Sequence, residues 1–282
     1  MKYGLVMEGG AMRGIFSAGV MDVLMENGVD FNGLIGVSAG ACFGCNYKSK
    51  QSGRVIRYNL RFCRDKRYCS FHSLITTGDM FGADFCYDTI PNKLDLFDSE
   101  TYINNPMKFY VNATDIESGK PVYHCLETVE PDELKWIRAS ASMPMAARIV
   151  NIDGRKFLDG GIADSIPLKF MECSGYDKNV VILTQPRDFV KKPSKSASLV
   201  KLFYRKYPNL IKVYLNRPKI YNEQLEHIRR SEKNGTAFVI APPKKLPIGH
   251  IEHDQDKLIE VYRTGRLTAM KRLPELLKFM NK

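Results

Sequence analysis

The chain has 282 residues, of which 44% are hydrophobic and 26% are charged, and it carries a formal net charge of +11. This composition is typical of a globular protein with a substantial core, and it excludes a disordered chain. No stretch reaches the roughly 18 consecutive apolar residues of a membrane span, and the Gly-rich run after Glu8 comes too early for a signal peptide. The 7 cysteines follow no disulfide framework, so we expect reduced thiols and a cytoplasmic protein.

The amino-terminal residues alternate between strand and helix signals. Tyr3–Met7 has the pattern of a buried strand, and apolar residues then repeat at helical spacing between Ile15 and Leu24. A second short strand ends at Val37, and the small residues after Ser38 can begin a helix. This strand–helix–strand–helix order favours a parallel sheet with helices on its faces.

The middle of the chain supplies a predicted helical cap and further strands. Residues 50–105 are polar and mixed, and we expect them to form a cap over the sheet. The remaining elements predicted in this part are a helix at 131–143, strands at 107–116 and 119–126, a hairpin turning at Asp153-Gly154, and a strand in the apolar run 179–186. Together they predict an α/β fold.

After Pro186 the composition changes, and Lys, Arg and Tyr become frequent. We predict helices and loops there, a last sheet strand at 236–243, and two terminal helices broken near Pro274. The predicted organisation is therefore a core of residues 1–186 and a basic helical extension of residues 187–282 that packs on it.

The basic excess is concentrated between Arg187 and Lys233, which contains 13 Lys and Arg but 4 Asp and Glu. Such a segment suits an anionic lipid surface, nucleic acid, or solubility alone. Because no nucleic-acid-binding motif accompanies it, we expect no nucleic acid partner. Peripheral attachment to the inner face of an anionic membrane remains a hypothesis.

A lone serine stands between two glycines directly after the second predicted strand, in Gly36-Val37-Ser38-Ala39-Gly40. This matches Gly-x-Ser-x-Gly, the nucleophile elbow, in which a sharp strand-to-helix turn exposes the serine hydroxyl. The small neighbours are needed because strand and helix pass close together. A Ser/Gly-rich turn without a catalytic role gives the same five residues.

A glycine-rich loop lies between the first strand and the first helix, where α/β proteins place ligands. It consists of Gly9, Gly10, Ala11, Met12, Arg13 and Gly14. One interpretation is a phosphate loop, although Ala11 replaces the middle glycine of that motif. The other is an oxyanion hole made of backbone N–H groups. A serine at the end of the neighbouring strand favours the oxyanion hole.

The third motif is Asp159-Gly160-Gly161, at the end of a predicted strand. An aspartate at this point could act as the general base that accepts the serine proton. The alternative is a turn aspartate, because Asp-Gly is a common turn pair.

Taken together, these three motifs resemble the three signatures of patatin-like phospholipases, in the order of that family. The stretch Ala139–Pro144 resembles the block that precedes the family's aspartate, and the resemblance covers roughly the first 185 residues. It implies a three-layer α/β/α fold with a mainly parallel central sheet. The basic carboxyl-terminal part resembles an extension found in a bacterial subgroup.

The resemblance also implies a chemistry. It implies a lipid acyl hydrolase, of the phospholipase A or lysophospholipase type, that works through an acyl-enzyme and needs no metal or organic cofactor. Ser38 is then the nucleophile, Asp159 the base of a Ser–Asp dyad, and the Gly9–Gly14 loop the oxyanion hole. The family usually has a third glycine where this chain has Ala11. If that position requires a positive φ, alanine costs on the order of 1 kcal/mol.

Two alternatives remain open at this stage. A Ser–Asp–His esterase could use one of the histidines that follow Asp159, namely His227, His250 or His253. A nucleotide- or phosphate-binding regulatory protein could use the Gly9–Gly14 loop as an anion cradle. Arg13 in this loop could meet a lipid phosphate, or it could pin the loop to a neighbouring carbonyl or carboxylate.

Overall fold

The centre of the protein is a sheet of short apolar strands. In the computed structural model, which describes residues 1–281, strand β1 (Tyr3–Met7) lies between β2 (Gly33–Gly36) and β7 (Lys178–Ile182), and β8 (Ala237–Ile240) is next to β7. Nearly every residue of these four strands is buried, as expected for parallel strands covered on both faces.

The sheet is mainly parallel. Its order is β5-β6-β3-β2-β1-β7-β8, and the neighbours from β3 (Lys108–Asp115) to β8 pair in parallel. The remaining pairings are antiparallel: β4 (Pro121–Cys125) pairs with residues 110–114 of β3, β6 (Arg155–Asp159) pairs with the last three residues of β3, and β5 (Val150–Ile152) pairs with β6. The two-residue turn between β5 and β6 is Asp153-Gly154, with φ values of 49° and 75°, as the sequence predicts.

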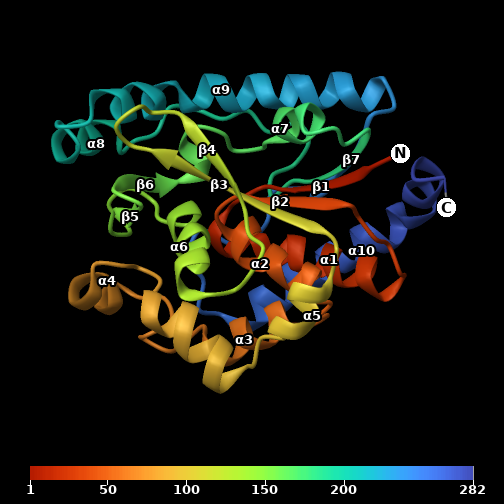
Figure 1. The fold of residues 1–282 in the computed structure, drawn as a ribbon, viewed down its shortest axis with the longest axis horizontal. Coiled ribbons are helices and arrows are strands. Elements are labelled where there is room, and N and C mark those ends of the chain that lie inside the picture. Colours follow the sequence, from red (N-terminus) through yellow and green to blue (C-terminus); the bar gives the residue numbers. More distant parts are fainter. Residues whose placement is uncertain (282) are drawn as a thin grey trace.

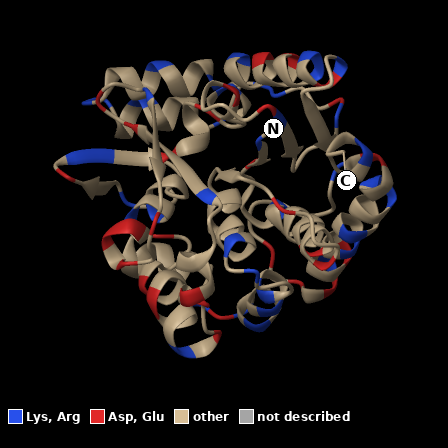
Figure 2. Ribbon diagram, turned by 45° about the vertical axis from the view of Figure 1, so that its right-hand side comes forward, with Lys and Arg blue, Asp and Glu red and all other residues tan. Residues whose placement is uncertain are grey.

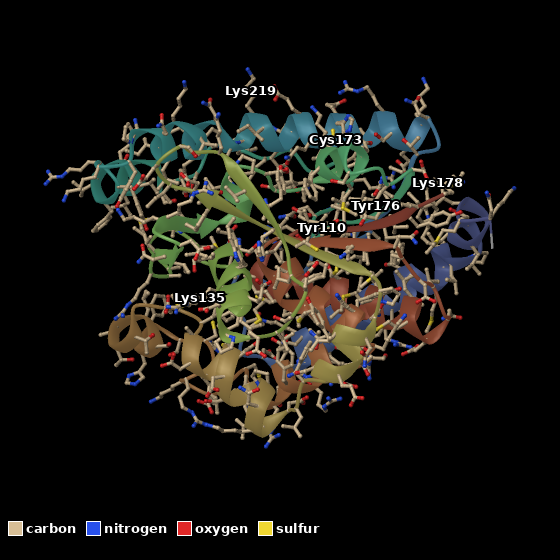
Figure 3. The ribbon with its side chains drawn as sticks, in the orientation of Figure 1. Tyr110, Lys135, Cys173, Tyr176, Lys178 and Lys219 are labelled. Atoms are coloured by element: carbon tan, nitrogen blue, oxygen red, sulfur yellow. The ribbon has the colours of Figure 1, made fainter. Side chains whose placement is uncertain are left out.

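Helices cover both faces and give the α/β/α fold that the sequence predicts (Figure 1). The helices below the sheet in Figure 1 include α1 (Gly14–Glu26), α2 (Ala39–Lys48), α6 (Pro131–Ser140) and α10 (Gln255–Phe279). Above it lie α7 (Leu168–Cys173), α8 (Ala197–Phe203) and α9 (Pro208–Lys233). Figure 3 shows Tyr110 and Tyr176 between the sheet and this upper layer, with ring centroids 6.4 Å apart.

Residues 50–105 are helical, as predicted, but their position differs from the prediction. They form α3 (Arg54–Phe62), α4 (Phe71–Thr77), a π-helical segment (Phe85–Leu94) and α5 (Ser99–Asn104). Helix α3 packs on α1, α2 and α10, and α5 packs on α2, so these two helices cover the lower helical layer rather than the sheet itself. The sheet face is already occupied by α1 and α2.

One prediction about the carboxyl-terminal helices is wrong. Helix α10 runs unbroken through Pro274 instead of dividing there. A proline inside a helix costs about 3 kcal/mol, but α10 packs very closely along α1. A Cβ atom on Gly265 would lie 2.1 Å from the carbonyl oxygen of Phe16. This close packing, with Leu276 buried beyond the proline, offsets the local cost.

The residues after 186 contribute to every layer of the fold. Strand β8 extends the sheet, α9 covers its upper face and α10 packs on α1. Figure 2 shows basic and acidic residues interspersed along the upper helices. Within residues 1–281, none of the helices has the length and hydrophobicity needed to cross a bilayer. All 7 cysteines are free thiols.

Candidate active site

Ser38 stands at the sharp turn between β2 and α2. Its backbone has φ 55° and ψ −122°, a strained conformation of the kind that costs about 1–3 kcal/mol and clusters at functional sites. The two flanking glycines are required by space. A Cβ on Gly36 would lie 2.3 Å from the carbonyl oxygen of Gly40, and a Cβ on Gly40 would lie 2.4 Å from that of Met7. The motif therefore has the geometry of a nucleophile elbow.

Asp159 ends β6 and is held by backbone contacts on each side. Its N–H donates to the carbonyl of Ser142 at 2.8 Å, and its own carbonyl accepts from the Thr114 hydroxyl at 2.8 Å. The carboxylate oxygen Oδ1 accepts the N–H of Gly161 at 2.8 Å. Gly160 allows this turn to lie against β3, since a Cβ there would be 2.3 Å from the carbonyl oxygen of Asn112.

The structure brings Ser38 and Asp159 together, although 121 positions separate them in the chain. Both side chains are buried, with 9% and 4% of their surface exposed. Burial raises the pKa of Asp159, while the positive charge of Arg217 and then the Ser38 hydroxyl lower it. The Ser38 hydroxyl is thus close enough to stabilise the ionised carboxylate, although within residues 1–281 no well-aligned hydrogen bond of 3.5 Å or less joins the two side chains. Such contacts are often loose in an enzyme without substrate.

The Gly9–Gly14 loop lies directly beside Ser38. A Cβ on Gly9 would be 2.8 Å from Cβ of Ser38, and the carbonyl of Gly9 is fixed by the Thr184 hydroxyl at 2.8 Å. Ala11 has φ 49°, so the position does require the left-handed conformation that favours glycine. The departure from three glycines therefore has an energetic cost in this chain.

Only part of this loop offers free donors. The amides of Met12, Arg13 and Gly14 already donate to backbone carbonyls, with Met12 bonding His250 at 3.3 Å. Within the described chain, the amides of Gly9, Gly10, Ala11 and Ala39 have no protein acceptor. The candidate oxyanion donors in the loop therefore narrow from six residues to Gly9, Gly10 and Ala11, and Ala39 at the start of α2 is added to them.

A largely apolar cavity of about 350 Å³ opens from Ser38 into the lower helical layer. Ala11, Ser38 and Ala39 line its catalytic end, and residues from α2, α6 and the segment between α3 and α5 line the rest. Its apolar lining includes Phe43, Tyr58, Met80, Phe81, Leu134 and Ile137. The size and lining are those of a pocket for an apolar ligand.

Polar groups in this pocket are few and mostly paired. The Arg138 guanidinium forms a 3.0 Å ion pair with Asp79, which sequence reasoning missed. Burial raises the pKa of Cys42 to about 11 and that of Cys45 to about 12, so both remain neutral thiols. Cys42 and Cys45 are therefore part of the pocket wall. A redox-active Cys-x-x-Cys motif has a thiol of lowered pKa, and neither of these two thiols has one.

The three histidines after Asp159 have different surroundings. His227, on α9, forms a 2.7 Å hydrogen bond with the carboxylate of Glu172 on α7. The ring of His253 forms a hydrogen bond with the backbone carbonyl of Cys63. His250 alone among the histidines of residues 1–281 lines the same pocket as Ser38. Desolvation and three nearby cations lower its pKa to about 4. Within the same residues no group of three or more His, Cys, Asp and Glu could hold a metal ion.

Three basic residues near Asp159 were not singled out as a group by the sequence. Lys191 follows β7 and Arg217 lies on α9, and both lower the pKa of Asp159 through their charge. Arg13 interacts electrostatically with Arg217 and Lys191. No local signal could have found them together, because the folded chain assembles them from positions about 200 residues apart.

The fold and the site define a class of protein, and comparison with known sequences agrees with it. The family model for patatin-like phospholipase matches residues 5–171, more than half of the chain. The protein belongs to the patatin-like phospholipase family, as its motifs predict. A second family model, described as a domain of unknown function (DUF6363), matches residues 207–281.

Individual relatives show how far the similarity extends. The uncharacterized protein YjjU of Escherichia coli K12 is 27% identical over 284 aligned residues, which cover 94% of this chain and 75% of YjjU. Lysophospholipase nte1 of Aspergillus terreus is 30% identical over 187 residues, covering 62% of this chain but 11% of the fungal protein. The crystal structure of VipD from Legionella pneumophila aligns with a TM-score of 0.49 and 13% identity, covering 97% of this chain and 67% of VipD.

Proposed function

We propose that this protein is a serine acyl hydrolase that cleaves fatty acyl esters with Ser38 as nucleophile and Asp159 as general base. The observation that carries the proposal is the strained turn at Ser38 beside a buried carboxyl and a loop with unpaired backbone amides. A nucleophile, a base and oxyanion donors at one point are the minimum set for acyl transfer.

The reaction follows from these positions. Asp159 accepts the proton of the Ser38 hydroxyl as the serine oxygen attacks the ester carbonyl. The resulting oxyanion is stabilised by the unpaired amides of the Gly9–Gly14 loop and by the amide of Ala39. The intermediate then collapses, and Asp159 returns the proton to the departing alcohol. An acyl-enzyme ester remains on Ser38. Water that gives a proton to Asp159 attacks this ester, the bond between the acyl carbon and the serine oxygen breaks, and Asp159 returns the proton to Ser38 as the fatty acid is released.

The apolar cavity supports a lipid substrate. It begins at Ser38 and has an apolar lining, so an acyl chain can enter it while the ester stays at the nucleophile. Lysophospholipids, phospholipids and glycerides all present such a chain. The name of the Aspergillus terreus relative, a lysophospholipase, supports the lysophospholipid class, although this chain matches a small part of that protein.

The test is hydrolysis of a lipid panel by the purified protein, followed by release of free fatty acid. Ser38→Ala is expected to reduce kcat by about 10⁴-fold or more, and Asp159→Asn by about 10²–10⁴-fold. Circular dichroism and thermal unfolding control for the fold. Full activity in a folded Ser38→Ala variant would reject the proposal.

A Ser–Asp–His esterase is the second candidate, because His250 lines the same pocket as Ser38. The proposed dyad predicts that His250→Gln retains kcat within a few-fold, as do His227→Gln and His253→Gln. A loss of about 10³-fold or more in His250→Gln alone would instead favour a triad.

We further propose that the protein docks on an anionic membrane through α8 and the residues around it. Leu199, Leu202 and Phe203 of this helix are 50%, 64% and 68% exposed. The surrounding exposed residues are basic, namely Lys192, Lys195, Lys201, Arg205 and Lys206. Exposed apolar side chains within a basic surface are typical of peripheral attachment to anionic lipid.

A further inference from the structure

Three cations from separate parts of the chain lie beside the candidate dyad. Arg13 belongs to the Gly9–Gly14 loop that contacts Ser38, Lys191 follows β7, and Arg217 lies on α9. The Arg217 guanidinium is next to the base, since a Cβ on Gly161 would be 3.3 Å from its Nη2 and 3.1 Å from Oδ1 of Asp159. Arg217 therefore lies on the Asp159 side of the site, where its charge acts on both Lys191 and Arg13.

These guanidinium groups have unmet hydrogen-bonding capacity. Within residues 1–281, the side chains of Arg13 and Arg217 form no hydrogen bond or ion pair with the protein, and Nε of each is buried without an acceptor. Buried donors without a partner are costly and mark a place where an acceptor is expected. One interpretation of the sequence was that the Arg13 side chain fixes its loop to a neighbouring carbonyl or carboxylate. Within residues 1–281 the side chain forms no such bond.

Lys191 is held in place from α9. The side chain of Asn222 accepts the Lys191 N–H at 2.9 Å and donates to its carbonyl at 3.1 Å, and the Lys191 ammonium lies 4.4 Å from the Tyr221 ring centroid. Burial and the charges of Arg217 and Arg13 lower the pKa of Lys191 to about 8, whereas Glu8 and Asp159 raise it. The lysine is thus ordered among like charges.

The nearby carboxylates offset these positive charges only in part, because within residues 1–281 neither Glu8 nor Asp159 forms an ion pair with any of the three cations. Glu8 already accepts the Tyr221 hydroxyl at 2.7 Å and the N–H of Thr184 at 2.6 Å. Asp159 is committed to Gly161 and, in the proposed mechanism, to Ser38. An anion with several oxygens would pair with all three cations at once, which is the arrangement that phosphate recognition requires.

We propose that Arg13, Lys191 and Arg217 bind a phosphate group of the substrate, next to the ester that Ser38 attacks. The inference rests on the proposed function and narrows it to acyl esters that carry a phosphate, in preference to neutral glycerides. Lys191 and Arg217 lie outside residues 5–171, which match the patatin-like family, and Arg217 belongs to the segment that matches a domain of unknown function. The proposal gives this segment a role in substrate selection.

The first experiment compares two short-chain esters below their micelle concentrations, a 1-acylglycerol and the corresponding 1-acylglycerol 3-phosphate. The intact protein is expected to have about tenfold or higher kcat/KM for the phosphorylated ester. Lys191→Gln and Arg217→Gln should each reduce this ratio by about tenfold, mainly through KM. Using monomeric substrates removes any effect of membrane attachment.

A matched control, Lys219, lies on α9, the helix that carries Arg217. Lys219 carries the same charge as Lys191, and Figure 3 shows it pointing away from α9 into solvent, where its side chain is 77% exposed. Lys219→Gln should leave the ratio unchanged. If all three variants reduce the ratio equally, long-range charge rather than a phosphate site explains the preference, and the proposal is wrong.

The second experiment measures binding without turnover, so its result does not depend on the proposed catalytic function. Calorimetry with the Ser38→Ala protein is expected to detect binding of the phosphorylated ester about tenfold tighter than the neutral ester, and Lys191→Gln should remove the difference. A parallel titration of the intact protein with inorganic phosphate shows whether the site also binds the free ion or only a phosphate that belongs to the substrate. Equal affinity and equal kcat/KM for both esters would overturn the proposal, even if inorganic phosphate binds.

Discussion

The backbone amide of Ser38 donates a 2.9 Å hydrogen bond to Oγ of Ser140, which lies 102 residues later in the chain. Two residues beyond, the carbonyl of Ser142 accepts the N–H of Asp159 at 2.8 Å. The end of α6 therefore connects the candidate nucleophile to the candidate base. This gives a physical role to the Ala139–Pro144 stretch, whose side chains do not include either reacting group.

Ser140→Ala removes the acceptor of this bond and leaves a buried N–H unpaired. We expect a loss of about 1–2 kcal/mol in the free energy of unfolding and a fall of roughly tenfold in kcat, because a small displacement of the nucleophile is costly. Ser142→Ala is the matched control. The Ser142 hydroxyl donates to the backbone carbonyl of Arg138, and the bond to Asp159 uses only the backbone carbonyl of Ser142. Equal kcat in the two variants would show that the Ser140 bond does not position the elbow.

Ala11→Gly tests the strain in the glycine-rich loop. Because Ala11 has φ 49°, glycine should relieve about 1 kcal/mol of backbone strain, of which the greater freedom of the unfolded chain cancels part. The expected result in urea unfolding is a net stabilisation of about 0.5 kcal/mol. Ala197→Gly in α8 should instead destabilise, by roughly 0.5–1 kcal/mol. Destabilisation by both substitutions would mean that position 11 is not strained.

The environment of Asp159 predicts the pH dependence of hydrolysis. Burial raises its pKa, and the base must be ionised, so kcat/KM should rise with pH through a midpoint above the usual aspartate value of about 3.9. The charge of Arg217 lowers this pKa, so Arg217→Gln should move the midpoint to higher pH.

This profile is best measured with a neutral ester, so that substrate ionisation and phosphate binding do not contribute. Lys219→Gln, with its exposed charge, should leave the midpoint in place. A midpoint at or below the usual aspartate value would be inconsistent with a buried general base at residue 159.

Attachment to a bilayer is tested with the double variant L202S/F203S in α8. The intact protein should bind vesicles that contain anionic lipid, with binding that weakens as salt is added. The double variant should lose about tenfold or more in vesicle affinity while its hydrolysis of a monomeric ester is retained.

Leu267→Ser provides the control for this experiment, because Leu267 is 67% exposed on α10, outside the basic segment. Equal binding to neutral and anionic vesicles, or equal losses in both variants, would contradict docking through α8.

Local patterns were sufficient to predict the parts of the fold that depend on nearby residues. Strand β1, the Ser38 turn and the Asp153-Gly154 hairpin were each predicted from a few consecutive residues, because backbone conformation at these points is set by side-chain periodicity and by turn chemistry. The family followed from the order of three short motifs.

Features that depend on packing could not be read in this way. Helix α10 continues through Pro274 because of its contact with α1, which no local rule contains. The Ser38–Ser140 bond and the group of Arg13, Lys191 and Arg217 join residues that meet only after the sheet and its covering helices have formed. Several residues that shape the candidate site, such as Lys191 and Arg217, therefore lie outside any recognisable sequence motif.

Reaction with a fluorophosphonate probe, followed by peptide mapping, measures whether Ser38 is a nucleophile activated by Asp159. We expect one covalent adduct, on Ser38, which is absent in Ser38→Ala and forms at least about 10²-fold more slowly in Asp159→Asn. A folded protein that stays unlabelled and binds a nucleotide through the Gly9–Gly14 loop would contradict a nucleophilic Ser38 and would favour the regulatory alternative.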